Sequence, residues 1–310
     1  MQDILTCAMG LDIHRDVIVA CLAKGELGTD PEIEIRSFST LIPEMRKLRD
    51  WVLEAECRYV AMESTGIYWQ PIYEMLEPCF DGQINILVVN ARHMKNVPGR
   101  KTDMRDAQWI ATLLRAGLLK GSFIPDKTFR ELRHLTRYRK SIVRDITAQK
   151  NRIDKFLQSS GFRFTAFLSD AFGASGRNII RHLMEYGNIS REALDRCLKT
   201  QTRKRIDEIL IALNGSLSEH QRGFLRMIFG HLEALEQHRH TVEDAITKEI
   251  TKHEEALSLL CSIPGIDVTA AAAIIAEIGT DMSAFPDSQH ICSWAGLSPG
   301  NTESDGKRKS

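Results

Sequence analysis

The chain has 310 residues, 43% of them hydrophobic, and its 41 Lys or Arg residues balance 41 Asp or Glu residues. This length and composition can support two folded domains with real hydrophobic cores. No apolar run approaches the ~20 residues of a membrane span, and Asp3 stands where a secretory signal would be basic. The seven cysteines form no CxxC pair that would indicate zinc. We therefore expect a cytoplasmic protein in a reducing compartment, with its cysteines as small buried hydrophobes and with no membrane contact.

The first third of the chain alternates strand and helix patterns. Three apolar segments separated by turn residues, 7–11, 17–22 and 33–38, are predicted to form an antiparallel meander. The pattern then predicts, in order, a helix at 41–53, a strand at 59–62, a helix at 68–76, a strand at 84–89 and a helix at 102–114 with Thr102 as its N-cap. The order βββαβαβα resembles that of a ribonuclease-H-like domain, which predicts an α/β fold with a mixed sheet.

Four acidic residues stand where this fold places its carboxylates. Asp12 and Glu63 close apolar strands, whereas Asp103 and Asp106 lie three apart in the first turn of a helix, on one face. Four converging carboxylates repel one another unless cations lie between them, and such hard oxygen ligands suit Mg²⁺ or Mn²⁺. Each carboxylate alone could be an ordinary cap or a solvated charge. The set together predicts a metal site.

The zero net charge hides a strong segregation along the chain. Residues 1–91 hold 7 Lys or Arg against 15 Asp or Glu, residues 92–155 hold 17 against 6, and residues 156–310 hold 17 against 20. A basic segment beside an acidic pocket favours a nucleic-acid enzyme over a solvated helix face. The residues expected to contact DNA or RNA phosphates are Arg100, Lys101, Arg130, Arg133, Arg137, Lys140 and Arg144, the last five at helical spacing.

The rest of the chain is predicted to be helical. Residues 218–259 carry an apolar seam typical of a coiled coil or a long antiparallel hairpin, with 191–211 as one candidate partner. The histidines along this segment lie on a charged face and are expected to be solvated. Residues 262–266, SIPGI, place a Pro-Gly turn between two helical segments. This resembles a helix-hairpin-helix, in which backbone N–H groups near Gly265 hold a phosphate; the alternative is an ordinary helical corner.

Five segments together resemble the DEDD transposases of the insertion sequence one-ten family. They are GLDIHR at 10–15, MESTGIYW at 62–69, VNARHMKNVPGRKTDMRDA at 89–107, SIPGI at 262–266 and SWAGLSPGNTESDGKRK at 293–309. The resemblance implies a RuvC-like catalytic domain with a basic helical extension over 1–155 and a helical, coiled-coil region over 156–256. A C-terminal transposase domain over 257–310 follows, and we expect it to be incomplete because the family pattern continues beyond the serine motif.

The resemblance also implies roles for individual residues. Asp12, Glu63, Asp103 and Asp106 match the acidic tetrad that binds divalent metal, and Ser304 matches the serine that attacks DNA and becomes linked to it. The implied partners are donor and target DNA, a structured noncoding guide RNA called the bridge RNA, and further copies of the chain in a dimer or tetramer. Without the family, Ser304 would be an ordinary turn serine. The alternative functions are a metal-dependent nuclease of the Holliday-junction-resolvase type and a catalytically inactive nucleic-acid-binding protein.

Overall fold

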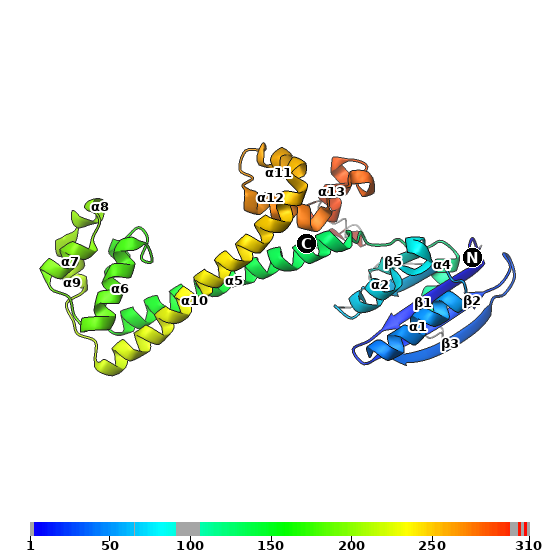
Figure 1. Ribbon diagram of the computed structural model, residues 1–310, viewed down its shortest axis with the longest axis horizontal. Coiled ribbons are helices and arrows are strands. Elements are labelled where there is room, and N and C mark those ends of the chain that lie inside the picture. The colour runs from blue at the N-terminus through cyan, green and yellow to red at the C-terminus, as the bar shows by residue number, and fades with distance from the viewer. Residues whose placement is uncertain (1–2, 65, 91–105, 298–302, 305–306, 309–310) are drawn as a thin grey trace. The chain divides into compact units, whose positions relative to one another are not determined.

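The computed structural model describes residues 3–64, 66–90, 106–297, 303–304 and 307–308 (Figure 1). The chain divides into two compact units, Met1–Ile124 and Pro125–Ser310. The domain boundary expected at residue 155 lies inside helix α5 (Lys127–Ser159), which belongs to the second unit. The reason is that the apolar face of α5, including Ile142 and Ile153, is buried in the core of that unit.

The first unit is built on a five-stranded mixed sheet, as predicted. Its strands are β1 (Cys7–Ile13), β2 (Val17–Lys24), β3 (Glu32–Ser39), β4 (Tyr59–Glu63) and β5 (Asn85–Val89). They lie in the order β3-β2-β1-β4-β5, with β1 to β3 antiparallel and with β4 and β5 parallel to β1. A mixed sheet in this order, followed by helices, fits a ribonuclease-H-like domain and confirms the predicted α/β class of the first unit.

Helices cover both faces of this sheet. They are α1 (Ile42–Glu54), α2 (Gln70–Leu76), the short η1 (Cys79–Gly82) and α4 (Asp106–Arg115). Met9 and Leu11 of β1 pack in one core with Leu48 of α1 and Ile72 of α2. The residues between them along β1 face the other way, toward α4, because successive side chains of a strand alternate between faces.

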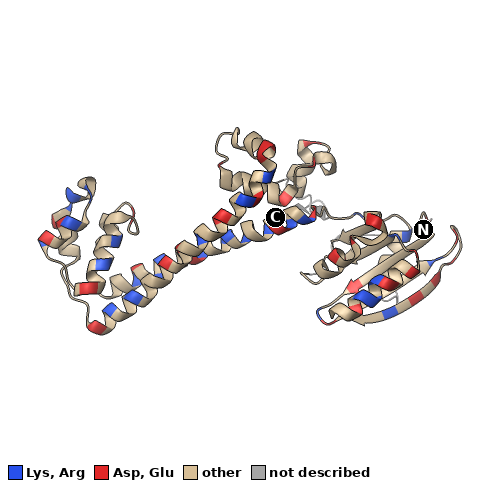
Figure 2. Cartoon of the chain, viewed as in Figure 1, with Lys and Arg blue, Asp and Glu red and all other residues tan. Residues whose placement is uncertain are grey.

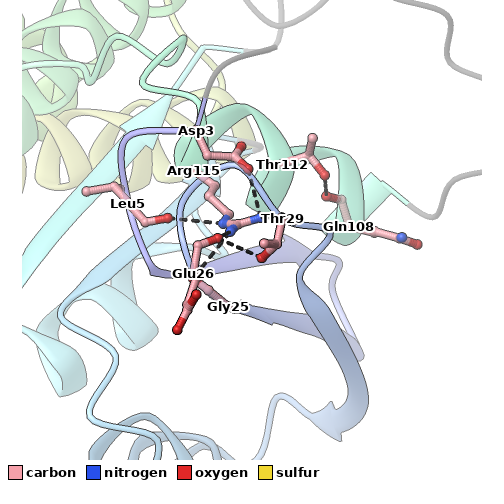
Figure 3. Close-up of polar contacts among 8 residues, drawn as sticks. All are labelled: Asp3, Leu5, Gly25, Glu26, Thr29, Gln108, Thr112 and Arg115. Carbon is pink, nitrogen blue, oxygen red and sulfur yellow. Dashed lines mark hydrogen bonds and ion pairs between the residues drawn. The ribbon is translucent and has the colours of Figure 1, made fainter.

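A buried arginine holds together the edge of the first unit where α4 ends. The side chain of Arg115 is 1% exposed and forms an ion pair with Asp3, with 2.9 Å between Nη1 and Oδ2. Its guanidinium also donates to four backbone carbonyls, those of Leu5, Gly25, Glu26 and Thr29 (Figure 3). The five N–H donors of one guanidinium thus tie the N-terminal segment and the β2–β3 loop to the end of α4.

The second unit is helical, and two long antiparallel helices, α5 and α10 (Glu219–Ile250), pack along each other (Figure 1). The remaining elements are η2 (Phe164–Phe167), α6 (Ala174–Tyr186), α7 (Arg191–Cys197), α8 (Thr200–Arg203), α9 (Ile206–Ala212), η3 (Thr251–His253), α11 (Glu254–Cys261), α12 (Val268–Ile278), η4 (Met282–Ala284), α13 (Ser288–Trp294), β6 (Glu303–Ser304) and β7 (Lys307–Arg308). No helix in the described ranges is long and apolar enough to cross a membrane.

The long helix differs from its prediction in extent and in partner. The predicted seam is buried at Leu225, Leu232 and Ile246, but α10 ends at Ile250, where a short 3₁₀ turn separates it from α11. Its partner is α5 and not 191–211, because that segment folds into three short helices, whereas α5 has 33 residues to match the 32 of α10.

All seven cysteines are free, and three of them, Cys21, Cys57 and Cys79, are buried. Burial raises the pKa of the Cys21 thiol to about 11, because the thiolate would lose its hydration. These three cysteines therefore behave as the expected small hydrophobes, while the other four are half-buried.

Candidate active site

The structure places Asp12 and Glu63 at the same edge of the sheet. In the parallel pairing of β1 with β4, Leu11 lies opposite Met62, so the next residues along the two strands are Asp12 and Glu63. Both carboxylates therefore stand at the carboxyl ends of neighbouring parallel strands. A rigid pair of strands fixes their backbone positions, which suits a site that must hold ligands at set distances.

Both carboxylates also stand on the face that α4 covers. Ala8 shares a face of β1 with Asp12, and Ala61 shares a face of β4 with Glu63, because side chains alternate along a strand. Ala8 and Ala61 are fully buried against Ile110 and Leu114 of α4. The side chain of Asp12 is 18% exposed, so this edge keeps access to solvent.

A glycine brings the first turn of α4 to this edge. A Cβ placed on Gly10 would lie 2.2 Å from the carbonyl oxygen of Ala107 and 2.4 Å from the amide nitrogen of Ala111. The backbone of α4 therefore rests directly on β1 two residues before Asp12, and only glycine permits that approach. Asp106 begins α4, next to Ala107, and thus belongs to the same end of the sheet as Asp12. The helix dipole favours a carboxylate in this first turn.

Asp103 lies outside the described residues, so the predicted tetrad is placed only in part. Within the described ranges, no three His, Cys, Asp or Glu side chains lie close enough together to hold a metal ion. Asp12, Glu63 and Asp106 nevertheless offer oxygen donors alone at one end of the sheet, and such a set fits Mg²⁺ or Mn²⁺ better than softer metals.

One neighbour of the candidate site was missed from the sequence. His14 Nε2 lies 3.2 Å from Asp12 Oδ2, and the His14 side chain is 61% exposed. The GLDIH motif could have predicted this contact, because in an extended chain side chains two residues apart, such as those of Asp12 and His14, lie on the same side. His14 thus contacts one of the two oxygens that Asp12 could offer to a ligand.

Ser304 lies in the second unit, whereas the three described carboxylates lie in the first. It forms part of the two-residue strand β6, which pairs antiparallel with β7 so that Ser304 stands opposite Lys307. Ser304 is therefore in a strand.

Some of the α5 cations that were predicted to contact phosphates form ion pairs within the protein instead. Arg133 and Arg137 both form ion pairs with Glu277, with nitrogen–oxygen distances of 3.0 and 2.8 Å. Arg133, whose side chain is 17% exposed, also donates to the carbonyl of Glu277 at the C-terminal end of α12. Burial lowers its pKa from the usual arginine value, although Glu277 opposes that shift. Lys140 and Arg144 are exposed and have no partner in the part of the chain that the structure describes.

The other predicted phosphate contacts are placed as follows. Arg100 and Lys101 lie outside the described residues. Arg130 donates to the carbonyl of Pro125 over 3.0 Å. Gly265 has a φ of +90° in the exposed turn between α11 and α12, which places the predicted Pro-Gly turn between two helices. The N-terminus of α12, however, is capped by Asp267, whose carboxylate accepts from the amide of Ala270 over 2.7 Å and so brings negative charge to the place where a phosphate would bind.

Comparisons with known proteins support the interpretation of this geometry. Residues 9–161 match a family model described as a transposase, of the DEDD type of IS110 elements. Residues 257–310 match a second model, described as transposase IS116/IS110/IS902 family. The chain belongs to the IS110 family of transposases.

A curated relative points to the same family. The "Insertion element IS110 uncharacterized 43.6 kDa protein" of Streptomyces coelicolor is 29% identical to this chain over 229 residues. That match covers 67% of this chain and 55% of the relative, so the chain aligns with about half of that protein. The first family model contains the sheet from residue 9 of β1 onward, α4 and all of α5, and the second contains α12 and the strands β6 and β7.

Proposed function

We propose that this IS110-family protein is a DNA transposase of the DEDD type, which cleaves and exchanges DNA strands with the help of Mg²⁺ or Mn²⁺. The observation that supports it most is the common position of Asp12, Glu63 and Asp106 at one end of a ribonuclease-H-like sheet. Asp103, three residues before Asp106 in the sequence, is the fourth proposed ligand. The proposed substrate is DNA because the family is one of transposases.

The carboxylates at this edge would have two tasks. When bound, the divalent cation would act as a Lewis acid that stabilises negative charge on the phosphate. Asp12 and Glu63, held on rigid strands, would orient the ligand sphere, and the exposed Asp106 could accept a proton from an attacking hydroxyl. Removing one carboxylate from a group of like charges relieves repulsion, so the fold should tolerate the loss of any one of them.

Ser304 is the proposed nucleophile. Its Oγ would form a bond to the scissile phosphorus while the bond from phosphorus to the leaving deoxyribose oxygen breaks. The serine proton would pass to a base and the leaving oxygen would take up a proton, so the number of phosphoester bonds is conserved. This conservation allows the strand to be rejoined to another end, which hydrolysis by water does not allow.

The proposed partners follow from the family resemblance. A structured noncoding bridge RNA would select donor and target DNA by base pairing, and the protein would act as a homo-oligomer, a dimer or a tetramer. Of the α5 cations predicted to contact phosphates, Lys140 and Arg144 are exposed and have no partner among the described residues, so they are the ones proposed to do so. Sequencing the RNA that co-purifies with the protein would test the guide.

A cleavage assay with matched variants tests the carboxylate site. Asp12→Ala should abolish metal-dependent strand cleavage while leaving DNA binding nearly unchanged. Asp16→Ala is the control, because Asp16 lies in the next turn and pairs with Arg15 at the surface. Full cleavage by Asp12→Ala would show that the site is assigned wrongly. The absence of any metal-dependent product from the unaltered protein would indicate a nucleic-acid-binding protein without activity.

Trapped covalent complexes test the nucleophile. Mass spectrometry should find the nucleotide on Ser304, and Ser304→Ala should eliminate this adduct without eliminating metal binding. Ser298→Ala and Ser310→Ala serve as controls, because both serines are close in sequence. A nucleotide on either of them would move the assignment, and hydrolysed ends without any adduct would favour a nuclease of the junction-resolvase type.

A further inference from the structure

A second basic surface lies in the part of the chain that neither family model reaches, between residues 161 and 257. It belongs to the lobe formed by α6, α7, α8 and α9, at the end of the long hairpin where α5 ends and α10 begins (Figure 1). The stretch 196–205, RCLKTQTRKR, contains no acidic residue. Its five cations are Arg196, Lys199, Arg203, Lys204 and Arg205, and Figure 2 shows Lys and Arg side by side at the tip of this lobe.

The acidic residues that flank this stretch already form ion pairs or hydrogen bonds. Asp195 pairs with Arg203 over 2.9 Å, and Glu208 pairs with Arg205 over 2.7 Å. Asp207 pairs with Arg191. The pKa of Glu192, at the start of α7, is lowered by hydrogen bonds from its own backbone amide and from Ser190, and less by the charges of Arg191 and Arg196. Each of these carboxylates thus has local hydrogen-bond or ion-pair partners.

Three cations remain on the outside. Arg196, Lys199 and Lys204 are exposed, and none of them has an ion-pair partner in the described ranges of the chain. Between them stand the exposed Thr200 and Gln201, whose hydroxyl and amide groups can also donate to phosphate oxygens. Lys199 and the residues to Thr202 line a cavity of about 350 Å³ against the turn that leads into α6.

The surface is held firmly by the fold beneath it. Leu194 and Leu198 are buried in the core that also contains α5 and α10. The backbone amide of Lys199 donates to Ser175 Oγ over 3.0 Å, and the guanidinium of Arg203 donates to the carbonyl of Leu198. The backbone that carries the three exposed cations is therefore fixed, so a polyanion could bind them without rearranging the lobe.

We propose that Arg196, Lys199 and Lys204 bind the phosphate backbone of duplex DNA. Every exposed side chain from 196 to 204 is polar, so the surface lacks the apolar anchors of a protein interface. The stretch 196–205 itself contains no aromatic ring on which single-stranded RNA bases could stack, and the exposed ring of Tyr186, near Arg196, already packs against His182. Contacts with phosphates position a duplex without selecting its sequence. The inference rests on DNA being the substrate, as proposed above.

The length of the hairpin indicates where this DNA would lie. Helices of 33 and 32 residues extend for roughly 50 Å at ~1.5 Å per residue. The lobe is attached at one end of this pair, and α12 packs through Glu277 on the first turns of α5 at the other. DNA held by the lobe therefore lies more than one turn of duplex, roughly 34 Å, from the end of the hairpin on which α12 packs.

Equilibrium binding to a linear duplex of mixed sequence, measured across salt concentrations, tests the proposal. The variant R196Q/K199Q/K204Q should bind more weakly, and its plot of log binding constant against log salt should be less steep by roughly 2.7, because each lost phosphate contact removes about 0.9. The control R46Q/K47Q/K120Q removes the same formal charge from exposed positions of the first unit and should change neither quantity. Circular dichroism checks that both variants are folded.

The outcomes separate this proposal from the proposed function. If the salt slope of the lobe variant is unchanged, or if the control variant changes it equally, the lobe does not bind DNA as proposed. DNA can still be the substrate in that case. A change of slope with an RNA duplex alone also overturns the proposed surface and assigns the lobe to RNA. If the unaltered protein binds no DNA at any salt concentration, the proposed function itself fails. If the lobe variant binds DNA more weakly but still cleaves it, while Asp12→Ala does not cleave, both the proposed surface and the proposed function are supported.

Discussion

Among single residues, Arg115 is the most buried charged side chain in the described part of the chain. It is buried, and its guanidinium satisfies four carbonyls and the carboxylate of Asp3, groups that come from two separate segments (Figure 3). A buried ion pair adds little net stability compared with an apolar core, but breaking one leaves the partner charge unsatisfied. Arg115 therefore serves mainly to hold the N-terminal segment and the β2–β3 loop in one arrangement.

Arg115→Met should destabilise the first unit by about 3 kcal/mol, because Asp3 and the carbonyls lose their donors while the methionine offers none. Arg115→Lys should cost less, since it keeps the charge but loses the planar fork. Urea unfolding followed by tryptophan fluorescence would measure this, as Trp51, Trp69 and Trp109 lie in the first unit. Lys47→Gln, which removes a surface pair with Glu44, is the control and should change stability little. Equal midpoints for Arg115→Met and Lys47→Gln would contradict this role.

At the scale of elements, the contact between β1 and α4 determines the candidate site. The two elements meet backbone to backbone at Gly10, with no side chain between them. This contact places the N-terminus of α4, and Asp106 with it, at the carboxyl end of β1. A helix packed even slightly further from the sheet would move Asp106 away from Asp12, and metal ligands tolerate little displacement.

Gly10→Ala should therefore lower both stability and cleavage. Its methyl group would overlap the backbone of Ala107 and Ala111, and overpacking of this kind costs about 1 to 3 kcal/mol. Gly230→Ala is a matched control with the opposite sign, because that glycine lies in the interior of α10 with open space around it, where alanine favours the helix by about 0.5 to 1 kcal/mol. Thermal unfolding and the cleavage assay measure both effects. If Gly10→Ala matched the unaltered protein in both, α4 would not depend on this contact.

At the scale of the whole molecule, the two units have separate hydrophobic cores. The first consists of buried residues from the sheet, α1, α2 and α4, and the second of residues from α5 onward. Cooperative unfolding requires shared buried contacts, so separate cores favour separate transitions. The ion pairs that join α5 to α12 through Glu277 belong entirely to the second unit.

Differential scanning calorimetry should accordingly resolve two transitions. Arg115→Met should lower the temperature of one, and Arg133→Gln that of the other, since Arg133 is half-buried and satisfies carbonyls at the end of α12. Arg137→Gln is the control for the second change, because the Arg137 side chain is 63% exposed and its pair with Glu277 lies at the surface. A single transition that shifts equally with both variants would indicate that the two units unfold as one.

Local sequence patterns were enough to predict the strands and helices of the first unit and the candidate carboxylates at the ends of its strands. Period-two and period-3.6 apolar patterns located the five strands, α1, α2 and the C-terminal end of α4 to within a few residues, because burial of one face imposes these periods directly on the chain. The predicted N-cap of the last helix, Thr102, lies outside the described residues. Asp12 and Glu63 were found in the same way, as charges at the ends of buried strands. The resemblance to the family suggests the proposed role of Ser304, which no local pattern indicates.

The pairing of distant segments could not be predicted from local patterns. Arg133 and its partner Glu277 are separated by 144 residues, so a helix face that is basic in sequence proved to be partly neutralised by α12. The partner of α10, the five contacts of Arg115 and the approach of α4 to Gly10 are equally non-local. Such pairings depend on the shapes and lengths of whole elements, and the periodicity of one segment carries no information about the segment that will cover it.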